Sequence, residues 1–183
     1  MPTALLLLAL LALRPALPPA AARAHVAAAQ AASAPDLPAE VLLGVAAVES
    51  DFSGARLSWR ECAGGTCRRR TGPWAGAAPP PRAAPSWYCG ATGVGGYVPW
   101  ERCAQLMRDV PLSYRVAAAH LREWARLART VPACADATLA SDSGLRCALA
   151  GYNGGFRAVR AGSSYPARVL RFAALLRAKG RPQ

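Results

Sequence analysis

The stretch Val41–Phe52 (VLLGVAAVESDF) decides the fold, because it is an apolar run that ends in a carboxylate. Just upstream, Asp36 offers a side-chain cap and Pro38 needs no backbone N–H, so both suit a helix start. The pattern therefore predicts a helix over roughly residues 37–50. On that helix a stripe with a spacing of three and four residues should face the core. Its members are Val41, Val45, Val48, Glu49 and Phe52.

Glu49 is the unusual member of this stripe. A carboxylate facing a core is costly to ionise, so its pKa should rise above that of a free glutamate. A raised pKa makes the acid form available to donate a proton near neutral pH. The alternative is an ordinary glutamate at a helix end that turns to solvent or pairs with an arginine, since most glutamates are exposed.

Residues 1–24 resemble a secretory signal peptide. The apolar run from Ala4 to Leu13 is too short to cross a membrane, and Ala22-Arg23-Ala24 fits the small-x-small pattern of a cleavage site. Residues 25–183 would then form one domain with a core of its own. We expect an exported protein with no stable insertion in the membrane after cleavage.

The chain is strongly basic, with a formal net charge of +12, and Lys179 is its only lysine. A basic exported protein is attracted to anionic polymers such as cell wall, lipid headgroups or extracellular nucleic acid. No nucleic-acid-binding motif is visible, so we expect no nucleic-acid partner.

Six cysteines in an exported chain predict three disulfides, although fifteen pairings are possible for six cysteines. Cys134–Cys147 is the favoured pair because it closes one short polar loop. Zinc is a weaker alternative, because the chain has no C-x-x-C motif and almost no histidine. The six candidates are Cys62, Cys67, Cys89, Cys103, Cys134 and Cys147.

The remaining pattern predicts a mainly helical class. Residues 111–129 and 165–179 have the periodicity of amphipathic helices. An apolar helix that includes residues 146–153 should stop at Gly154-Gly155. Few strand patterns are visible.

Three segments are predicted to lack regular structure. Residues 25–35 are Ala-rich and suggest a loose leader. Residues 53–58 and the Cys- and Pro-rich residues 59–89 have the composition of loops. The Gly-rich residues 90–96 predict a tight turn in which backbone passes close to another group.

Three motifs now stand in order: Glu49–Phe52, Gly90–Pro99, and Ala150–Gly155 with Tyr165 and Val169 after it. Together they resemble the soluble lytic transglycosylase family, over about residues 37–176. The resemblance implies an all-α, lysozyme-like fold and cleavage of the MurNAc–GlcNAc bond of peptidoglycan. It also implies a bacterial periplasmic or secreted enzyme that binds glycan strands and uses no cofactor.

The same resemblance implies roles for single residues. Glu49 matches the family's single catalytic acid/base. Ser58 matches a serine that contacts substrate or intermediate, and Tyr152 matches a tyrosine that hydrogen-bonds near the catalytic glutamate. Asn153 matches a motif position more often linked to structure than to chemistry.

The chain departs from the family pattern at two substrate-binding positions. Gly96 stands where the family has a glutamine that helps to hold substrate, and Val98 stands at the second methionine position. Residues 59–89 are an insertion that could form a lid or an extra wall of the groove. Four aromatic residues there could stack on sugar rings or pack against the disulfides: Trp59, Trp74, Trp87 and Tyr88.

Most glycosidases need two carboxylates, so a second catalytic acid would be expected beside Glu49. Five other acids were considered, and none is persuasive: Asp51, Glu101, Asp109, Glu123 and Asp142. The resemblance itself implies one-carboxylate chemistry, in which Glu49 protonates the glycosidic oxygen and the substrate's N-acetyl group supports the anomeric carbon. Glu49 would then take the proton of the 6-hydroxyl as an anhydro ring closes.

Three other functions stay open. The protein could be a lysozyme-type muramidase that uses water, a non-catalytic peptidoglycan-binding protein, or a cationic membrane-active protein. A copper site made by His25 and His120 is disfavoured, because two histidines without a third ligand are a poor metal site. We therefore expect no metal.

Overall fold

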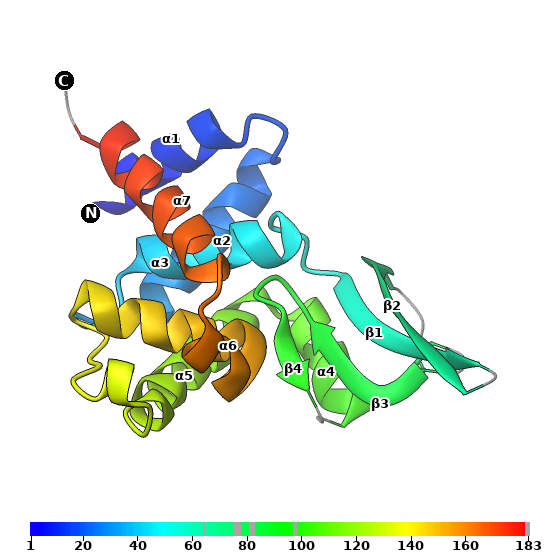
Figure 1. Ribbon diagram of the computed structural model, residues 1–183. Coiled ribbons are helices and arrows are strands. Elements are labelled where there is room, and N and C mark those ends of the chain that lie inside the picture. The colour runs from blue at the N-terminus through cyan, green and yellow to red at the C-terminus, as the bar shows by residue number, and fades with distance from the viewer. Residues whose placement is uncertain (64, 75–77, 81–82, 97–98, 182–183) are drawn as a thin grey trace.

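The computed structural model describes residues 1–63, 65–74, 78–80, 83–96 and 99–181. Helices form one body of the molecule, and a twisted sheet projects from it (Figure 1). The helices are α1 (Thr3–Leu13), α2 (Pro19–Ala32), α3 (Ala39–Ser50), α4 (Trp100–Arg108), α5 (Val110–Ala128), η1 (Pro132–Cys134, a 3-10 turn), α6 (Asp142–Ala161) and α7 (Tyr165–Lys179). The strands are β1 (Arg56–Ala63), β2 (Thr66–Pro73), β3 (Ala83–Cys89) and β4 (Val94–Gly96).

Helix α3 confirms the predicted opening helix and lies within the helical body, in contact with α2, α5 and α7. It is buried on more than the predicted stripe, because Leu42 and Leu43 are as inaccessible as Val45. At Gly44 a Cβ atom would lie 2.6 Å from the carbonyl oxygen of Val169, so glycine lets α7 approach this closely.

The prediction that the Asp36 side chain caps α3 is wrong. Pro38 occupies the N-cap position, and no side chain caps the helix. Asp36 instead lies 3.7 Å from Arg122 of α5, in an exposed ion pair. The fixed φ of proline suits a helix entry, so the turn can start without the carboxylate.

Two of the later helices follow their predicted periodicity closely. Helix α5 buries Ala117 and Leu121, and α7 buries Val169 and Leu176. Helix α6 differs from the prediction, because helical structure resumes after the Gly154-Gly155 break and continues to Ala161. The two glycines do leave helical geometry, so they mark a kink rather than an end.

The predicted loose leader at 25–35 is wrong, because most of it belongs to α2. His25 and Val26 are buried there, and α2 packs against α3 and α5. Alanine has the highest helix propensity, so an Ala-rich segment needs only a surface to pack on. The predicted cleavage point after Ala24 falls inside α2, and secretory processing stays a prediction.

Helix α1 packs against α2 and α7, with Leu6 and Leu10 fully buried. Among the residues that the structure describes, no helix combines the length and the apolarity needed to cross a membrane.

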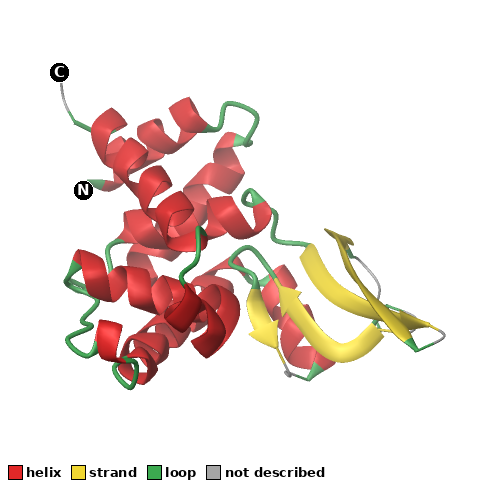
Figure 2. Ribbon diagram, in the orientation of Figure 1, coloured by secondary structure: helices red, strands yellow, loops and turns green. Residues whose placement is uncertain are grey.

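The largest correction concerns residues 53–89, which were predicted to be loop. Strands β1, β2 and β3 lie within this range and form most of a four-stranded antiparallel sheet in the order β2-β1-β3-β4, drawn in yellow in Figure 2. The class is therefore mainly α with a small sheet, rather than all-α. Backbone pairing dictates the β1–β2 hairpin more than an apolar face does, since β2 is exposed along nearly its whole length.

All six cysteines form disulfides, as predicted, and Cys134–Cys147 is one of them. Cys62–Cys67 joins directly opposed residues of β1 and β2. Cys89–Cys103 ties the end of β3 to α4, and both of its residues are fully buried. The sheet is thus covalently attached to a helix close to the Gly-rich turn.

Candidate active site

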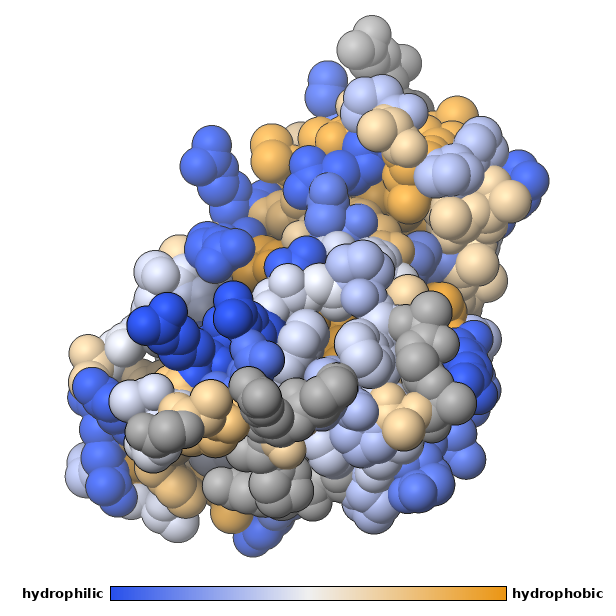
Figure 3. Space-filling model, turned by 90° about the vertical axis from the view of Figure 1, so that its right-hand side faces the viewer, coloured by the Kyte–Doolittle hydropathy of each residue, from blue (hydrophilic) through white to orange (hydrophobic). Residues whose placement is uncertain are grey.

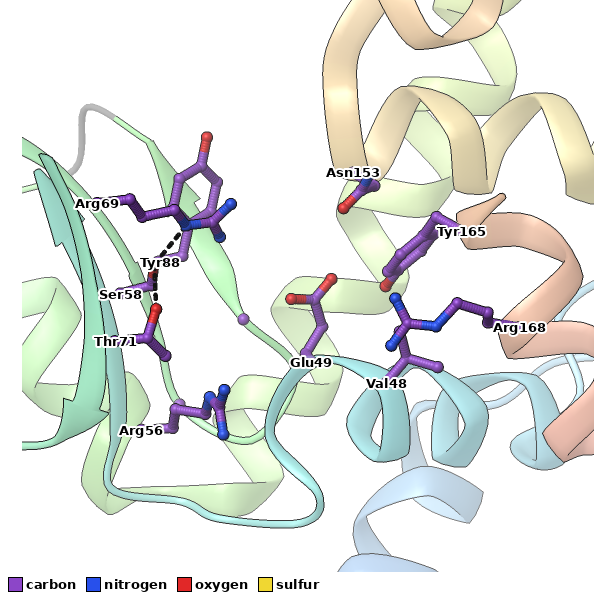
Figure 4. Close-up of a pocket in the computed structure, with 12 residues that line it drawn as sticks. Val48, Glu49, Arg56, Ser58, Arg69, Thr71, Tyr88, Asn153, Tyr165 and Arg168 are labelled. Atoms are coloured by element: carbon purple, nitrogen blue, oxygen red, sulfur yellow. Dashed lines mark hydrogen bonds between the residues drawn. The ribbon is translucent and has the colours of Figure 1, made fainter. Parts of the chain in front are cut away.

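A cavity of about 280 Å³ lies where the sheet meets the helical body. Figure 4 shows Glu49, at the end of α3, between two walls of side chains. Ser58, Arg69, Thr71 and Tyr88 lie on the sheet side, and Asn153, Tyr165 and Arg168 lie on the helix side. The lining residues are Val48, Glu49, Arg56, Ser58, Arg69, Thr71, Tyr88, Gly90, Gly93, Asn153, Tyr165 and Arg168.

Glu49 has the raised pKa that its position on the helix predicts. Burial is the main cause, because loss of water penalises the carboxylate. The Tyr165 hydroxyl and three guanidinium groups act in the opposite direction and partly offset this rise of the pKa. The side chain is only half-buried, so a ligand can reach it, and its raised pKa keeps the acid form available to higher pH than in a free glutamate.

The Gly-rich turn lines the cavity with Gly90 and Gly93, and Gly93 packs directly against Glu49. Gly93 has φ +64°, and a Cβ atom there would lie 2.6 Å from Oε2 of Glu49. Next to Glu49, the hydroxyl of Ser50 donates a 2.6 Å hydrogen bond to the carbonyl of Ala91. The turn is thereby held against the end of α3, and the carboxyl group occupies the space of the missing side chain.

Tyr152 supports the same turn from behind. Its hydroxyl donates a 2.7 Å hydrogen bond to the carbonyl of Thr92, and the Thr92 hydroxyl lies 2.7 Å from the hydroxyl of Ser113 in α5. Tyr152 is buried and is not among the residues that line the cavity. Burial is the main cause of the raised pKa of Tyr152, and the charge of Glu49 raises it further. The second effect is consistent with the expected place of Tyr152 near Glu49.

The sheet wall is organised around Ser58 of β1. Arg69 of β2 donates a 2.9 Å hydrogen bond from Nε to the Ser58 hydroxyl oxygen, and the Thr71 hydroxyl donates another at 3.2 Å. The Arg69 guanidinium also lies 5.7 Å from the ring centroid of Tyr88, in cation–π range. Three strands thus supply one polar wall with an aromatic surface.

The helix wall comes from α6 and α7. Asn153 lines the cavity just before the kink of α6, and Tyr165 and Arg168 lie in the first turn of α7. The Tyr165 ring stacks on Tyr152 with 6.4 Å between centroids. Its buried hydroxyl lies beside Glu49 without meeting strict hydrogen-bond geometry within the described part of the chain. A small movement would let Tyr165 donate to Glu49.

The predicted contacts at the substituted motif positions stay unsupported. Gly96 pairs with Trp87 at the end of β4. Val98 lies outside the residues that the structure describes.

Of the four aromatic residues proposed to stack on sugars, one faces the cavity. Tyr88 lines it and is 40% exposed. Trp59 and Trp74 pack on each other with ring centroids 6.1 Å apart. Trp87 is buried and meets Trp100 of α4 edge to face, so packing rather than stacking on a ligand describes it.

The other acids lie away from Glu49 or are engaged elsewhere. Asp51 pairs with Arg14 at 2.8 Å, and Glu123 and Asp142 pair with arginines of their own helices. Glu101 and Asp109 line a different hollow, beside α4. Glu49 is therefore the only carboxylate among the described residues that line the cavity.

The two histidines have different surroundings. His25 lies 3.1 Å from the Tyr114 hydroxyl and 3.0 Å from the carbonyl oxygen of Phe52. His120 accepts a hydrogen bond from Trp124. No cluster of three metal-ligating side chains occurs within the described ranges.

Sequence reasoning missed the cationic half of the site. It singled out Glu49, Ser58 and Asn153, which do meet in one cavity, but not Arg56, Arg69 or Arg168. An alternating β pattern would have indicated which residues of 56–73 share a face, yet so many of them are charged or polar that no apolar stripe marks that face. Tyr165 was visible only as a motif residue.

Comparison with known families, known proteins and solved structures finds no match for this chain. What the cavity does must therefore be inferred from the residues that line it.

Proposed function

We propose that this protein is a peptidoglycan lytic transglycosylase with a lysozyme-like arrangement of its helices, and that Glu49 is its single acid/base. One observation carries the proposal: a half-buried glutamate with a raised pKa is the only carboxylate among the described residues of the cavity. A cleft between a helical body and a sheet suits an extended glycan strand. The order of the three motifs along the chain, which resembles that of lytic transglycosylases, favours peptidoglycan as the substrate.

The reaction begins with proton donation. Glu49 in its acid form protonates the glycosidic oxygen between MurNAc and GlcNAc as that bond breaks. The 2-acetamido oxygen of the sugar stabilises the positive anomeric carbon, because no protein carboxylate is available for that role among the described lining residues. This replaces the second carboxylate of ordinary glycosidases.

The reaction ends with the same residue as base. The Glu49 carboxylate accepts the proton of the sugar's 6-hydroxyl, whose oxygen bonds to the anomeric carbon and closes a 1,6-anhydro ring. Glu49 is then protonated again, and no water is consumed. Between the two proton transfers, the Tyr165 hydroxyl can donate a hydrogen bond to the Glu49 carboxylate, which stabilises this charged form.

Export fits this activity. Three disulfides form and persist in the periplasm or outside the cell, where peptidoglycan is accessible. The net charge of +12 favours association with an anionic wall.

Mass spectrometry of purified peptidoglycan after incubation tests the proposal. Fragments one water lighter than hydrolysed fragments are expected, and fragments with hydrated ends would instead establish a muramidase. Glu49→Gln should lower the rate by about 10²–10⁴-fold, the usual contribution of a general acid. Glu101→Gln, outside the cavity, is the control and should keep the wild-type rate.

A non-catalytic peptidoglycan-binding protein is the second candidate. The observation in its favour is Gly96, which has no side chain where a substrate-holding glutamine is expected. It predicts co-sedimentation with peptidoglycan and no soluble fragments at any pH. The digest therefore separates the two functions.

A further inference from the structure

Three arginines surround Glu49 from three different elements. Arg56 comes from β1, Arg69 from β2 and Arg168 from α7, and the positive charge of each lowers the Glu49 pKa. All three line the cavity. The cavity therefore contains three guanidinium groups and one carboxyl group whose pKa is raised by burial.

These three arginines have no acidic partner among the described residues, and they share one cavity with Glu49. Five arginines elsewhere form ion pairs with aspartate or glutamate: Arg14, Arg70, Arg122, Arg126 and Arg146. Within the described part of the chain, Arg56, Arg69 and Arg168 form no ion pair with an aspartate or glutamate, and this includes Glu49. Arg69 uses Nε on Ser58, which leaves its terminal nitrogens for a ligand.

The surroundings of the cavity are also hydrophilic. Figure 3 shows hydrophilic side chains in patches on the face that carries the sheet. On β2, Arg68, Arg69 and Arg70 are exposed. Arg70 is paired with Glu61, so its charge is partly compensated. Three arginines without an acidic partner thus line the same cavity as Glu49.

We propose that Arg56, Arg69 and Arg168 bind a carboxylate of the glycan substrate next to the bond that is cleaved. Guanidinium groups match carboxylate geometry with two parallel hydrogen bonds, and such charge-assisted bonds are strong. The carboxylate has two sources in peptidoglycan, the free lactyl group of a MurNAc without its peptide, or an acid of the stem peptide. This inference rests on the proposed function and names the substrate feature that the same site selects.

The bound carboxylate would also act on the catalytic proton. The charged or titratable groups facing Glu49 are the three arginines, Tyr165 of α7 and Tyr152 of α6. A substrate anion among the arginines offsets their field, so Glu49 holds its proton more firmly when the correct substrate is bound. The alkaline limb of the pH–rate profile, which reports deprotonation of Glu49, should then lie at higher pH with an anionic substrate than with a neutral one.

Calorimetric titration of the Glu49→Gln variant tests the inference without turnover. The ligands are GlcNAc–MurNAc oligomers with a free lactyl acid and oligomers with the stem peptide, each compared with a neutral counterpart. The counterparts carry a lactyl group reduced to the alcohol and a peptide with amidated acids. We expect at least one acidic form to bind about tenfold more tightly than its counterpart, and whichever acid shows the preference identifies the source.

Arg168→Gln in the same background should abolish most of that preference. Arg171→Gln is the matched control, because Arg171 lies on the same helix outside the cavity and should leave the preference intact. Equal binding of acidic and neutral oligomers overturns the inference, and so does an effect of Arg171→Gln as large as that of Arg168→Gln.

The outcomes for the two proposals are distinguishable. If the wild-type protein cleaves peptidoglycan but shows no acid preference, the arginine inference alone fails. If it shows the preference but releases no fragments, the proposed enzymatic function fails and a carboxylate-specific glycan-binding site remains.

Discussion

The helical body and the sheet were built by different kinds of sequence information. In the body, α5 and α7 bury stripes whose spacing follows the helical period, and α3 is buried on nearly all sides along most of its length. All three segments were predicted to be helical. In the sheet, β2 is exposed along nearly its whole length and carries Arg68–Arg70, so its sequence has no apolar face that would indicate a strand. A helix is encoded by local periodicity, whereas this sheet depends on strand pairing and on disulfides.

The cavity lies on the boundary between these two regions, and each contributes a different chemistry. The body supplies Glu49, Asn153 and Tyr165, and the sheet supplies Ser58 and Arg69. The acid could therefore be predicted from the sequence, while most of the cationic surroundings could not. Breaking the attachment between the regions is the most direct way to test how much each depends on the other.

The largest expected effect comes from the disulfide at the boundary. Replacing Cys89 and Cys103 by alanine opens a loop with a separation of 14 residues and should cost about 3 kcal/mol of stability. Replacing Cys62 and Cys67, separated by 5 residues at the hairpin, should cost about 2 kcal/mol. Urea unfolding of the two variants measures both costs. A larger loss from the hairpin variant would contradict the view that the boundary holds the sheet in place.

Gly93 tests the contact between the turn and the acid. Gly93→Ala and Gly65→Ala both force a side chain on a residue with positive φ, at roughly 1 kcal/mol each. Only at Gly93 would the new Cβ meet Glu49, since nothing lies within 4 Å at Gly65. We expect peptidoglycan cleavage to fall by roughly 10²-fold in Gly93→Ala, as misplaced groups usually cause, and to persist in Gly65→Ala.

A comparable loss of cleavage in both glycine variants would point to general destabilisation. Thermal unfolding of the same samples provides the check, because the two variants should lose similar stability while only one loses turnover.

A smaller effect is expected from the two stacked tyrosines. Tyr152→Phe leaves the buried carbonyl of Thr92 without its partner and should cost about 1–3 kcal/mol. Tyr165→Phe removes a hydroxyl that has no strictly aligned partner in the described structure, so its stability loss should be less. It should instead raise the Glu49 pKa, because the hydroxyl lowers it, and so shift the pH–rate profile upward. A shift in the opposite direction would contradict this role of Tyr165.

The smallest expected effect is a pH-dependent difference in stability. The Glu49 pKa is raised by folding, so its contribution is fully present below the ordinary value of 4.5 and is lost as pH rises through the folded pKa. Glu49→Gln has no charge to bury. Its melting temperature relative to wild type should therefore increase from pH 4.5 toward neutrality. Parallel melting curves across that range would show that Glu49 is not destabilised by burial.

The errors of prediction share one physical cause. Residues 25–35 were mistaken for a loose leader because alanine gives little periodic contrast, yet α2 buries His25 and Val26. The strands between residues 56 and 73 were mistaken for loop because the segment was judged by its Cys-, Pro- and Gly-rich composition, and no apolar alternation indicates a strand there. One signal was available there: Gly64-Gly65 between two flanking cysteines is the composition of a two-residue hairpin turn.

By itself the sequence determined helices α3, α5 and α7, the presence of three disulfides and the position of a carboxyl group near the end of α3. These features depend on local spacing and composition, which a chain carries whatever its final shape. Only the tertiary structure decided that Ser58, Arg69 and Arg168 meet Glu49, because residues on three elements converge only after the sheet has docked. Whether Glu49 is an ordinary helix-end glutamate or a proton donor depends on that docking, which withdraws it from water and surrounds it with arginines.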